Sequence, residues 1–314
     1  MRFPSVAVVI VNYNGESWLT RCLKSLRRTD YPDFRTILVD NDSRDGSVDM
    51  VTTGFPEVEV IRAGGNLGFC EGNNLGIRRA LESGAELVAL LNPDTWVEPE
   101  WLRNLVEVSQ YNPEIGIVGA VQLRYDGNDF NSWTKTAFPA LLDELRVPEA
   151  GRDWIPVEWV EGACLLVKRA VLDEVGWLDP IFFAFYEEID LCRRVRAHGY
   201  GIGLVPRSRI HHFRGGSWES TPELHRERNF RCDRSQFVYE LTDPQRRFSA
   251  NLVAGFRTLA TKVRGAVVSR SPSQIIDLLR ILIELIRLGG PIGRKWSNDR
   301  MSCQSSACKS NEYN

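Results

Sequence analysis

The chain has 314 residues, of which 43% are hydrophobic, and its formal net charge is -2. This length suffices for one large domain or two small ones with a buried core, and the near-neutral charge gives no overall reason to expect nucleic-acid binding. The seven cysteines form no C-x-x-C pair, which favours a reduced chain over a disulfide framework or a structural zinc site.

The chain begins with an apolar run of six residues, 6–11, which ends in asparagines rather than at a small-residue cleavage site. We therefore expect no signal peptide. No apolar run in the sequence is long enough to span a bilayer as a helix. The expected location is the cytoplasm, including the inner face of the cytoplasmic membrane.

Short apolar runs alternate with helix-like segments from the N-terminus to about Val121. The predicted strands are 6–11, 36–40, 58–63, 86–92 and 116–123, and the predicted helices are 17–28, 46–54, 73–84 and 99–110. Strands that alternate with helices usually form a parallel sheet with helices on both faces. The pattern predicts an α/β fold of this kind.

The middle of the chain is less regular. Residues 124–159 show weak periodicity and are expected to form loops or short strands. A second ordered block covers 159–176, an acidic segment follows it, and a strand is predicted at 201–206.

The C-terminal region differs in composition, because residues 251–300 carry nine Lys and Arg against three Asp and Glu. Within it, 271–291 reads as a helix, with Ser271 as N-cap, Pro272 in the first turn and Gly289 at the stop. Its charged residues form one narrow stripe and the rest is Ile and Leu. Such a helix must bury most of its surface, either in a protein interface or at a membrane surface. Residues 301–314 are expected to be disordered.

Polar residues follow the first two predicted strands. Asn12 and Asn14 end the first strand, and Asp40 ends the second. Ligands of parallel sheets bind beyond the carboxyl ends of the strands, although a polar turn before a helix would explain the asparagines as well. No G-x-G-x-x-G or G-x-x-x-x-G-K-[ST] motif is present, which counts against a dinucleotide-binding oxidoreductase and a P-loop enzyme.

The segment GGNLGFCEGNNLGI (64–77) is interpreted as a ligand-binding loop before a helix. Glycines such as Gly68 allow a backbone to approach a ligand closely, and amides such as those of Asn66 and Asn74 bond bases, sugars or phosphates. A merely flexible loop would explain the glycines but not the asparagines.

Two further segments could hold a metal ion. In LLNPDT (90–95), Pro93 would fix a turn that places Asp94 at the sheet edge, where a carboxylate could bind Mg²⁺ or Mn²⁺. In VPRSRIHHFRGGS (205–217), His212 lies beside a basic, glycine-rich stretch that could meet a metal or a phosphate. A simple Asn-Pro-Asp turn and a structural histidine are the alternatives.

The acidic segment FFAFYEEIDLCRR (182–194) places Glu187, Glu188 and Asp190 within four residues. Carboxylates stabilise a helix N-terminus, so capping alone could explain all three. Glu187 and Asp190 share one helix face, while Glu188 projects about 100° away from it. A division of roles is therefore expected, with Glu188 facing a substrate and the other two holding the loop.

Together, the ordered motifs VIVNYNG, VDNDSRDGS, NLGFCEGNNLG, LLNPDT, VEGACLLVKR, FYEEIDLCRR and HHFRGGS resemble the inverting family-two glycosyltransferases of the GT-A fold, and most closely their rhamnosyltransferase-like branch. The resemblance covers about Val6 to Arg231. It implies a GT-A catalytic domain over 1–240, a basic helical extension over 241–300 and a tail over 301–314.

The resemblance also implies roles for individual residues. Asn12 and Asp40 would line the nucleoside pocket, with Asn14, Asn66, Gly68 and Asn74 near the donor. Asp94 matches the last position of the D-x-D metal motif, whose first position is Asn92 here, and His212 would complete the site for Mg²⁺ or Mn²⁺. Glu188 takes the place of the catalytic base, where the family usually has Asp; Asp190 and then Glu187 are the next candidates.

The resemblance implies a function as well. The chain would transfer a sugar from dTDP-rhamnose or a UDP-sugar to a hydroxyl of a glycan or lipid-linked acceptor, with inversion, in cell-surface polysaccharide synthesis. A nucleotidyltransferase and a non-catalytic carbohydrate-binding relative are the alternatives. The C-terminal helix would contact a membrane or form a homodimer, and no nucleic-acid partner is expected.

Overall fold

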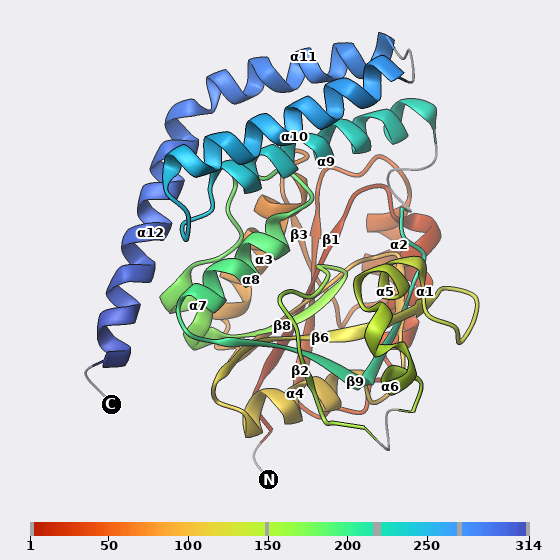
Figure 1. The fold of residues 1–314 in the computed structure, drawn as a ribbon. Helices are drawn as coiled ribbons and strands as arrows, with labels where there is room; N and C mark the ends of the chain where they lie inside the picture. The colour runs from red at the N-terminus through yellow and green to blue at the C-terminus, as the bar shows by residue number, and fades with distance from the viewer. Residues whose placement is uncertain (1–2, 148–150, 216–220, 269–271, 312–314) are drawn as a thin grey trace.

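Figure 1 shows the computed structural model, which describes residues 3–147, 151–215, 221–268 and 272–311, with side chains described up to residue 302. A central sheet carries helices on both faces, and the helices of the C-terminal region pack together along one side of it (Figure 1). The predicted α/β class, with a mostly parallel sheet and a helical C-terminal extension, is confirmed.

The described strands form one mixed sheet in the order β3-β2-β1-β4-β8-β6-β9-β5, with β7 pairing β9. β1 is parallel to both β2 and β4, whereas β8 is antiparallel to β4 and β6. The strands are β1 (Val6–Asn12), β2 (Phe34–Asp40), β3 (Glu59–Arg62), β4 (Leu87–Leu91), β5 (Thr95–Val97), β6 (Ile115–Arg124), β7 (Ile155–Pro156), β8 (Cys164–Lys168) and β9 (Gly201–His212).

The helices before the C-terminal region cover the two faces of this sheet (Figure 1). They are α1 (Glu16–Leu26), α2 (Ser47–Gly54), α3 (Gly68–Glu82), α4 (Trp101–Tyr111), α5 (Ser132–Ala137), α6 (Leu142–Arg146), α7 (Arg169–Val175) and α8 (Glu187–Ala197). All five strands predicted before Val121 and all four predicted helices are present, with ends that differ by a few residues.

β1 shows why an apolar run forms the middle of the sheet. Val6, Val8 and Ile10 pack into the core on one face, while Ala7 and Val9 pack into the core on the other. Side chains alternate between the faces of a strand, so a strand buried on both faces must be apolar at every position.

Two predictions about local structure were wrong in part, and one predicted strand is longer than expected. The loop predicted over 64–77 is mostly α3, because the helix already begins at Gly68. The irregular stretch 124–159 contains α5 and α6, and Asn131 caps α5 by accepting a hydrogen bond from the Thr134 amide at 2.8 Å. The predicted strand 201–206 continues to His212, because its second half pairs with β5 and β6.

Four long helices follow the sheet: α9 (Pro222–Leu241), α10 (Phe248–Val268), α11 (Pro272–Arg287) and α12 (Gly289–Asn311). α9, α10 and α11 lie side by side, and α12 runs down the flank of the molecule beside α8 (Figure 1). The expected helix ends before Gly289 as predicted, and the proposed cap Ser271 lies outside the described residues.

The expected disordered tail is helical as far as it is described. α12 continues to Asn311, and its Ser302 hydroxyl lies 2.7 Å from His198 Nε2 on α8. The Arg300 guanidinium donates to the Arg246 carbonyl at 3.1 Å. Because α12 makes these contacts with earlier parts of the chain, it continues past residue 300, where the composition predicts disorder.

α11 turns its charged stripe toward the protein. Arg226 of α9 binds Asp277 at 3.0 Å, and Arg234 of α9 binds Glu284 at 2.6 Å. The opposite side of the helix is apolar and exposed at Ile275, Ile276, Leu279, Ile283 and Ile286. An ordinary surface helix turns its apolar stripe to the core; α11 buries Leu278 and Ile281 in this way but also exposes a second, larger apolar side. No described helix is long and apolar enough to cross a membrane.

Candidate active site

One cavity of about 660 Å³ opens where several of the predicted motifs meet. Loop and strand ends of the sheet, the start of α8 and the first half of α9 all contribute to its wall. Among the predicted site residues, those that line it are Asn66, Gly68, Asn92, Asp94, Glu187, Glu188 and His212.

Asp94 and His212 face each other in this wall. Asp94 precedes β5 and His212 ends β9, and the antiparallel pairing of the two strands places Thr95 opposite His212. The Asp94 Oδ1 atom lies 3.2 Å from His212 Nε2, and both side chains are at most a tenth exposed. Two motifs that are 118 positions apart in the sequence therefore form one pair of metal-type ligands.

The orientation of His212 is fixed by Gln122 of β6, whose Oε1 lies 2.8 Å from His212 Nδ1. This contact holds the proton on Nδ1 and leaves Nε2 directed at Asp94. Burial lowers the pKa of His212, but the Asp94 carboxylate outweighs burial and the pKa is raised. Asn92 adds a buried Oδ1 atom that has no hydrogen-bond partner among the described residues.

The acidic pair Glu187–Glu188 lines the same cavity. Phe185 and Tyr186, immediately before α8, have φ values of 70° and 69°, a left-handed conformation that costs about 1–2 kcal/mol per L-residue. Such backbone strain persists where the surroundings impose it, often at functional sites. The turn directs both glutamates into the cavity wall, and one buried oxygen of each has no hydrogen-bond partner among the described residues.

The surroundings of Glu188 favour its protonated form. Burial and the nearby Glu161 carboxylate raise the pKa of Glu188 to about 7, although the Gly162 backbone lowers it. Gly162 also packs against Glu188, since an added Cβ would lie 3.4 Å from Glu188 Cβ and 3.6 Å from its Cγ. Burial, Glu188 and Asp190 raise the pKa of Glu187 well above its ordinary value. A carboxylate that titrates near neutral pH is suited to accept a proton.

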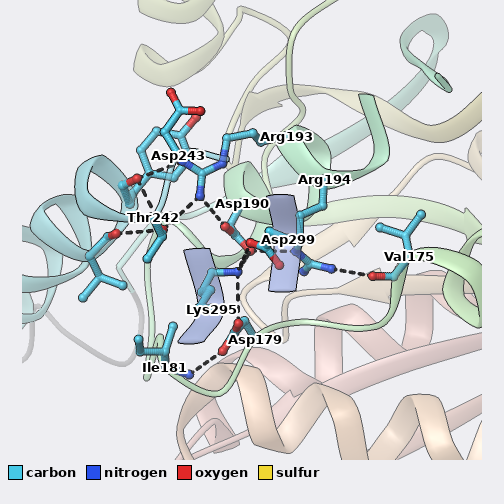
Figure 2. Close-up of polar contacts among 12 residues, drawn as sticks. Val175, Asp179, Ile181, Asp190, Arg193, Arg194, Thr242, Asp243, Lys295 and Asp299 are labelled. Carbon is cyan, nitrogen blue, oxygen red and sulfur yellow. Dashed lines mark hydrogen bonds and ion pairs between the residues drawn. The ribbon is translucent and has the colours of Figure 1, made fainter. Parts of the chain in front are cut away.

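Asp190 lies outside the cavity, so the structure does not support it as an alternative base. Its side chain is fully buried, and its oxygens bind Arg193 at 2.7 Å, Arg194 at 2.9 Å and Lys295 at 3.0 Å (Figure 2). Burial raises the pKa of Asp190, but Lys295, Arg194 and Arg193 together hold it well below its usual range. A carboxylate so strongly paired is a poor proton acceptor.

Gly68 and Asn66 shape the cavity near α3. Gly68 has φ of +77°, and an added Cβ would meet the Phe183 carbonyl oxygen at 2.6 Å, so a side chain is excluded there. The Phe69 amide donates to the same carbonyl at 2.8 Å, and Asn66 Oδ1 accepts from the Gly68 amide at 3.0 Å. These bonds join the start of α3 to the loop that leads into α8.

The remaining predicted donor residues support the site from outside the cavity. Asn12 is fully buried and donates to Asp40 at 3.1 Å, which ties together the ends of β1 and β2. Asn14 accepts from the Arg44 amide at 2.8 Å on the exposed surface. Asn74 lies on α3, and its amide bonds both the carbonyl and the N–H of Leu178, at 2.8 and 3.2 Å. Asn74 is thus a clamp on the α7–α8 loop.

Several residues of the cavity wall were not predicted. Glu161 belongs to the motif VEGACLLVKR, but its ion pair with Arg214 at 3.5 Å joins residues far apart in the sequence and has no local signal. Arg228 and Arg231 of α9 lie at the end of the resemblance, where no helix was predicted. Because the two arginines are three positions apart, they would share one face of a helix, and this spacing could have indicated a basic surface.

A sequence profile described as Glycosyl transferase family 2 matches residues 7–176, more than half of the chain. The chain belongs to this family. The matched part contains the donor-side motifs and Asp94, whereas Glu188, His212 and the C-terminal helices follow it.

Two relatives of this chain are named as sugar transferases. The low-salt glycan biosynthesis hexosyltransferase Agl10 of Haloferax volcanii is 30% identical over 202 residues, which are 63% of this chain and 64% of that protein. The N-acetylglucosaminyl-diphospho-decaprenol L-rhamnosyltransferase of Mycobacterium tuberculosis is 26% identical over 245 residues, covering 69% of this chain and 79% of that enzyme.

Solved structures share the GT-A fold of this glycosyltransferase. The mannosyltransferase PcManGT from Pyrobaculum calidifontis, solved in complex with GDP-Man and Mn²⁺, has a TM-score of 0.57 and 18% sequence identity. The match covers 98% of this chain and 86% of that one. It therefore extends over the C-terminal helices as well as the sheet.

Proposed function

We propose that this glycosyltransferase moves a sugar, with inversion, from a nucleotide-diphosphate sugar to a hydroxyl group of a glycan or lipid-linked acceptor in cell-surface polysaccharide synthesis. The observation that carries the proposal is the position of Glu188, which faces the same cavity as Asn92, Asp94 and His212. The dTDP-rhamnosyl transferase RfbF of Shigella flexneri, 24% identical over 208 residues, favours dTDP-rhamnose as the donor, with UDP-sugars as the other class to test.

In the proposed reaction, Glu188 accepts the proton of the acceptor hydroxyl while the hydroxyl oxygen attacks the anomeric carbon of the donor sugar. The bond between that carbon and the diphosphate oxygen breaks, and its electron pair leaves with the diphosphate. Attack opposite the leaving group inverts the configuration. The pKa of about 7 at Glu188 supports this role, since a general base works best when it titrates near the working pH.

The other end of the cavity suits a divalent metal and a diphosphate. A carboxylate oxygen, an imidazole nitrogen and an amide oxygen, from Asp94, His212 and Asn92, are donor types that Mn²⁺ accepts. No group of three or more His, Cys, Asp or Glu among the described residues could hold a metal, so phosphate oxygens of the donor would have to complete the set. A metal bound there would neutralise charge that develops on the leaving diphosphate.

The Arg214, Arg228 and Arg231 side chains line the cavity too and would add positive charge along the path of the diphosphate. Their guanidinium groups match phosphate geometry with paired N–H donors. Arg231 is itself held by Glu227 at 2.8 Å and stacks 4.5 Å from the Phe183 ring. The stacking contact holds the Arg231 side chain beside the loop that leads into α8.

We also propose that the exposed apolar surface of α10 and α11 docks on an anionic lipid surface, which would bring the enzyme to a lipid-linked acceptor. α10 exposes Val253, Phe256, Val263 and Val267, and it packs beside α11, which carries its own exposed apolar row. Arg257, Arg264 and Arg287 are exposed and flank these rows. Apolar rows with basic flanks are typical of helices that lie in a membrane interface.

Turnover of candidate donors tests the proposed function. The full chain is incubated with N-acetylglucosaminyl-diphospho-decaprenol as the acceptor, which the name of one relative supplies, and with dTDP-rhamnose or one of a panel of UDP-sugars as the donor. Released nucleoside diphosphate is measured with Mn²⁺ and then with EDTA. We expect one donor to be consumed, EDTA to abolish its consumption, and NMR to show the opposite anomeric configuration in the product. Binding without consumption of any donor would instead indicate a non-catalytic relative, and retention would exclude direct displacement.

A further inference from the structure

Lys295 reaches the base-bearing helix from the far end of the chain. It belongs to α12, its side chain is 4% exposed, and its Nζ atom lies 3.0 Å from Asp190 Oδ2 (Figure 2). The same atom lies 3.0 Å from Asp179 Oδ2 and 2.9 Å from Asp299 Oδ2. All three donors of the ammonium group are therefore matched by carboxylates.

Asp190 connects this ammonium group to the segments that surround α8. Arg193 donates to the Tyr239 carbonyl at 2.8 Å and to the Thr242 hydroxyl at 3.0 Å, at the end of α9. Arg194 donates to the carbonyls of Val175 and Trp177 in the α7–α8 connection, at 3.0 and 2.6 Å. The cluster thus joins α8 to the preceding loop, to α9 and to α12.

The charges of the cluster balance in the folded chain, and α12 supplies one charge of each sign, Lys295 and Asp299. Asp179, Asp190 and Asp299 supply three carboxylates, and Arg193, Arg194 and Lys295 supply three cations. Buried charges are stable when they are paired and hydrogen-bonded. Without Lys295 the cluster would carry excess negative charge one turn from Glu187 and Glu188.

The turn before α8 is strained, because Phe185 and Tyr186 are in the left-handed region, and a strained turn persists only where its surroundings hold it. It is held from α9, where the Ser235 hydroxyl donates to the Ala184 carbonyl at 2.9 Å and the Tyr239 ring lies 5.5 Å from the Tyr186 ring. The Asp190 cluster holds it from the other side, since the Asp190 amide bonds the Tyr186 carbonyl at 2.8 Å.

We propose that Lys295 is a positioning residue for the reaction: by binding Asp190 it fixes the first turn of α8 so that Glu188 faces the cavity. The inference rests on the proposed function for its catalytic meaning, but the fixing of the turn can be measured without turnover. It makes the C-terminal helix a working part of the active site.

Hydrogen–deuterium exchange of the full chain tests the fixing of the turn. In Lys295→Met we expect the amides of residues 185–194 to exchange about tenfold faster or more, because their local opening becomes easier. The matched control is Arg300→Met, which removes another cation of α12. The Arg300 guanidinium donates to the Arg246 carbonyl rather than to a group on α8. Unchanged exchange in Lys295→Met, or an equal rise in the control, would overturn the proposal.

Kinetics test the consequence for catalysis, with whichever donor the native chain consumes. We expect Lys295→Met to lower kcat by about ten- to a hundredfold, as for a misplaced catalytic group, with the donor KM within about twofold of native. A loss confined to the donor KM would contradict positioning. If the native chain consumes no donor, the proposed function fails and the exchange experiment still decides whether Lys295 fixes the turn.

The double variant Lys295→Met/Asp190→Asn covers the case in which Lys295→Met does not fold. It removes one cation and one anion together, so the charge of the cluster stays balanced. We expect it to fold, to show fast exchange over 185–194 and to keep the low kcat. Native exchange and native kcat in the folded double variant would show that neither side chain positions the base.

Discussion

Glu188 is one methylene longer than the aspartate usual in the family, and its surroundings accommodate that length. Gly162 packs against its stem, and the carboxylates of Glu161 and Glu187 lie close enough to act on its charge. The carboxylate is therefore held among like charges in a partly desolvated wall. This arrangement raises its proton affinity, as a general base requires.

The pH dependence of turnover follows from this environment. Only ionised Glu188 can accept a proton, so kcat should rise with pH through a midpoint near 7 and fall to about a tenth one pH unit lower. In Glu161→Gln a repelling carboxylate is lost, the pKa of Glu188 falls, and the midpoint should move to lower pH. Steady-state rates from pH 5 to 9 measure both.

The control for this shift is Glu57→Gln, which removes an exposed carboxylate that pairs with Arg27 far along the chain. Its profile should match that of the native enzyme. A midpoint that moves upward in Glu161→Gln, or that stays fixed, would contradict the assigned role of Glu161 beside the base.

At the scale of the element, α11 is the clearest departure from an ordinary surface helix. Its acidic residues Asp277 and Glu284 pair with arginines of α9, and most of its isoleucines face solvent, with Ile286 80% exposed. The sequence predicts that most of this helix is buried, and the structure leaves the larger apolar side uncovered. A surface of this kind marks a site of contact with a partner or a membrane.

Sedimentation with vesicles tests the lipid surface as that partner. Full-length chain should pellet with phosphatidylglycerol vesicles but not with neutral phosphatidylcholine vesicles, and Leu279→Ser/Ile286→Ser should bind at least about tenfold more weakly. Because both side chains are exposed, the thermal stability of the double variant should stay close to native. Tyr111→Ser, which changes an exposed side chain on α4, should bind as the native chain does.

A homodimer is the competing explanation for the same surface. Light scattering would then show a dimer in the native chain and a monomer in the double variant, with no vesicle binding in either. That combination would contradict membrane docking. Point variants serve here better than a truncation after α9, since a truncation also removes Lys295 from the Asp190 cluster.

In the molecule as a whole, the features that the sequence predicts are those encoded by neighbouring residues, such as strands and short motifs. The strands β1, β2, β4 and β6 are apolar runs bounded by polar turns, so their existence follows from periodicity alone. Asp94, His212 and Glu188 were also identified from local motifs, and the fold brings all three to one cavity. Family resemblance supplied their expected roles, which the experiments above test.

Long-range pairing accounts for most of what the sequence did not predict. β5 has three residues and exists because it pairs with the end of β9, more than 110 positions away. The burial of Asp190 depends on Lys295, which is separated from it by 105 positions. Asn12 and Asn74 look like ligand-binding amides, but the folded chain gives them internal partners. Neither pattern nor spacing specifies such partners.

The central claim is that Glu188 accepts the proton of the attacking hydroxyl, and Glu188→Gln tests it most directly. The amide keeps the size of the side chain but cannot accept the proton, so transfer should fall by about 10²–10⁴-fold, while donor affinity, measured by calorimetry with Mn²⁺, stays within about twofold of native. Near-native transfer by Glu188→Gln, with donor binding intact, would contradict the claim.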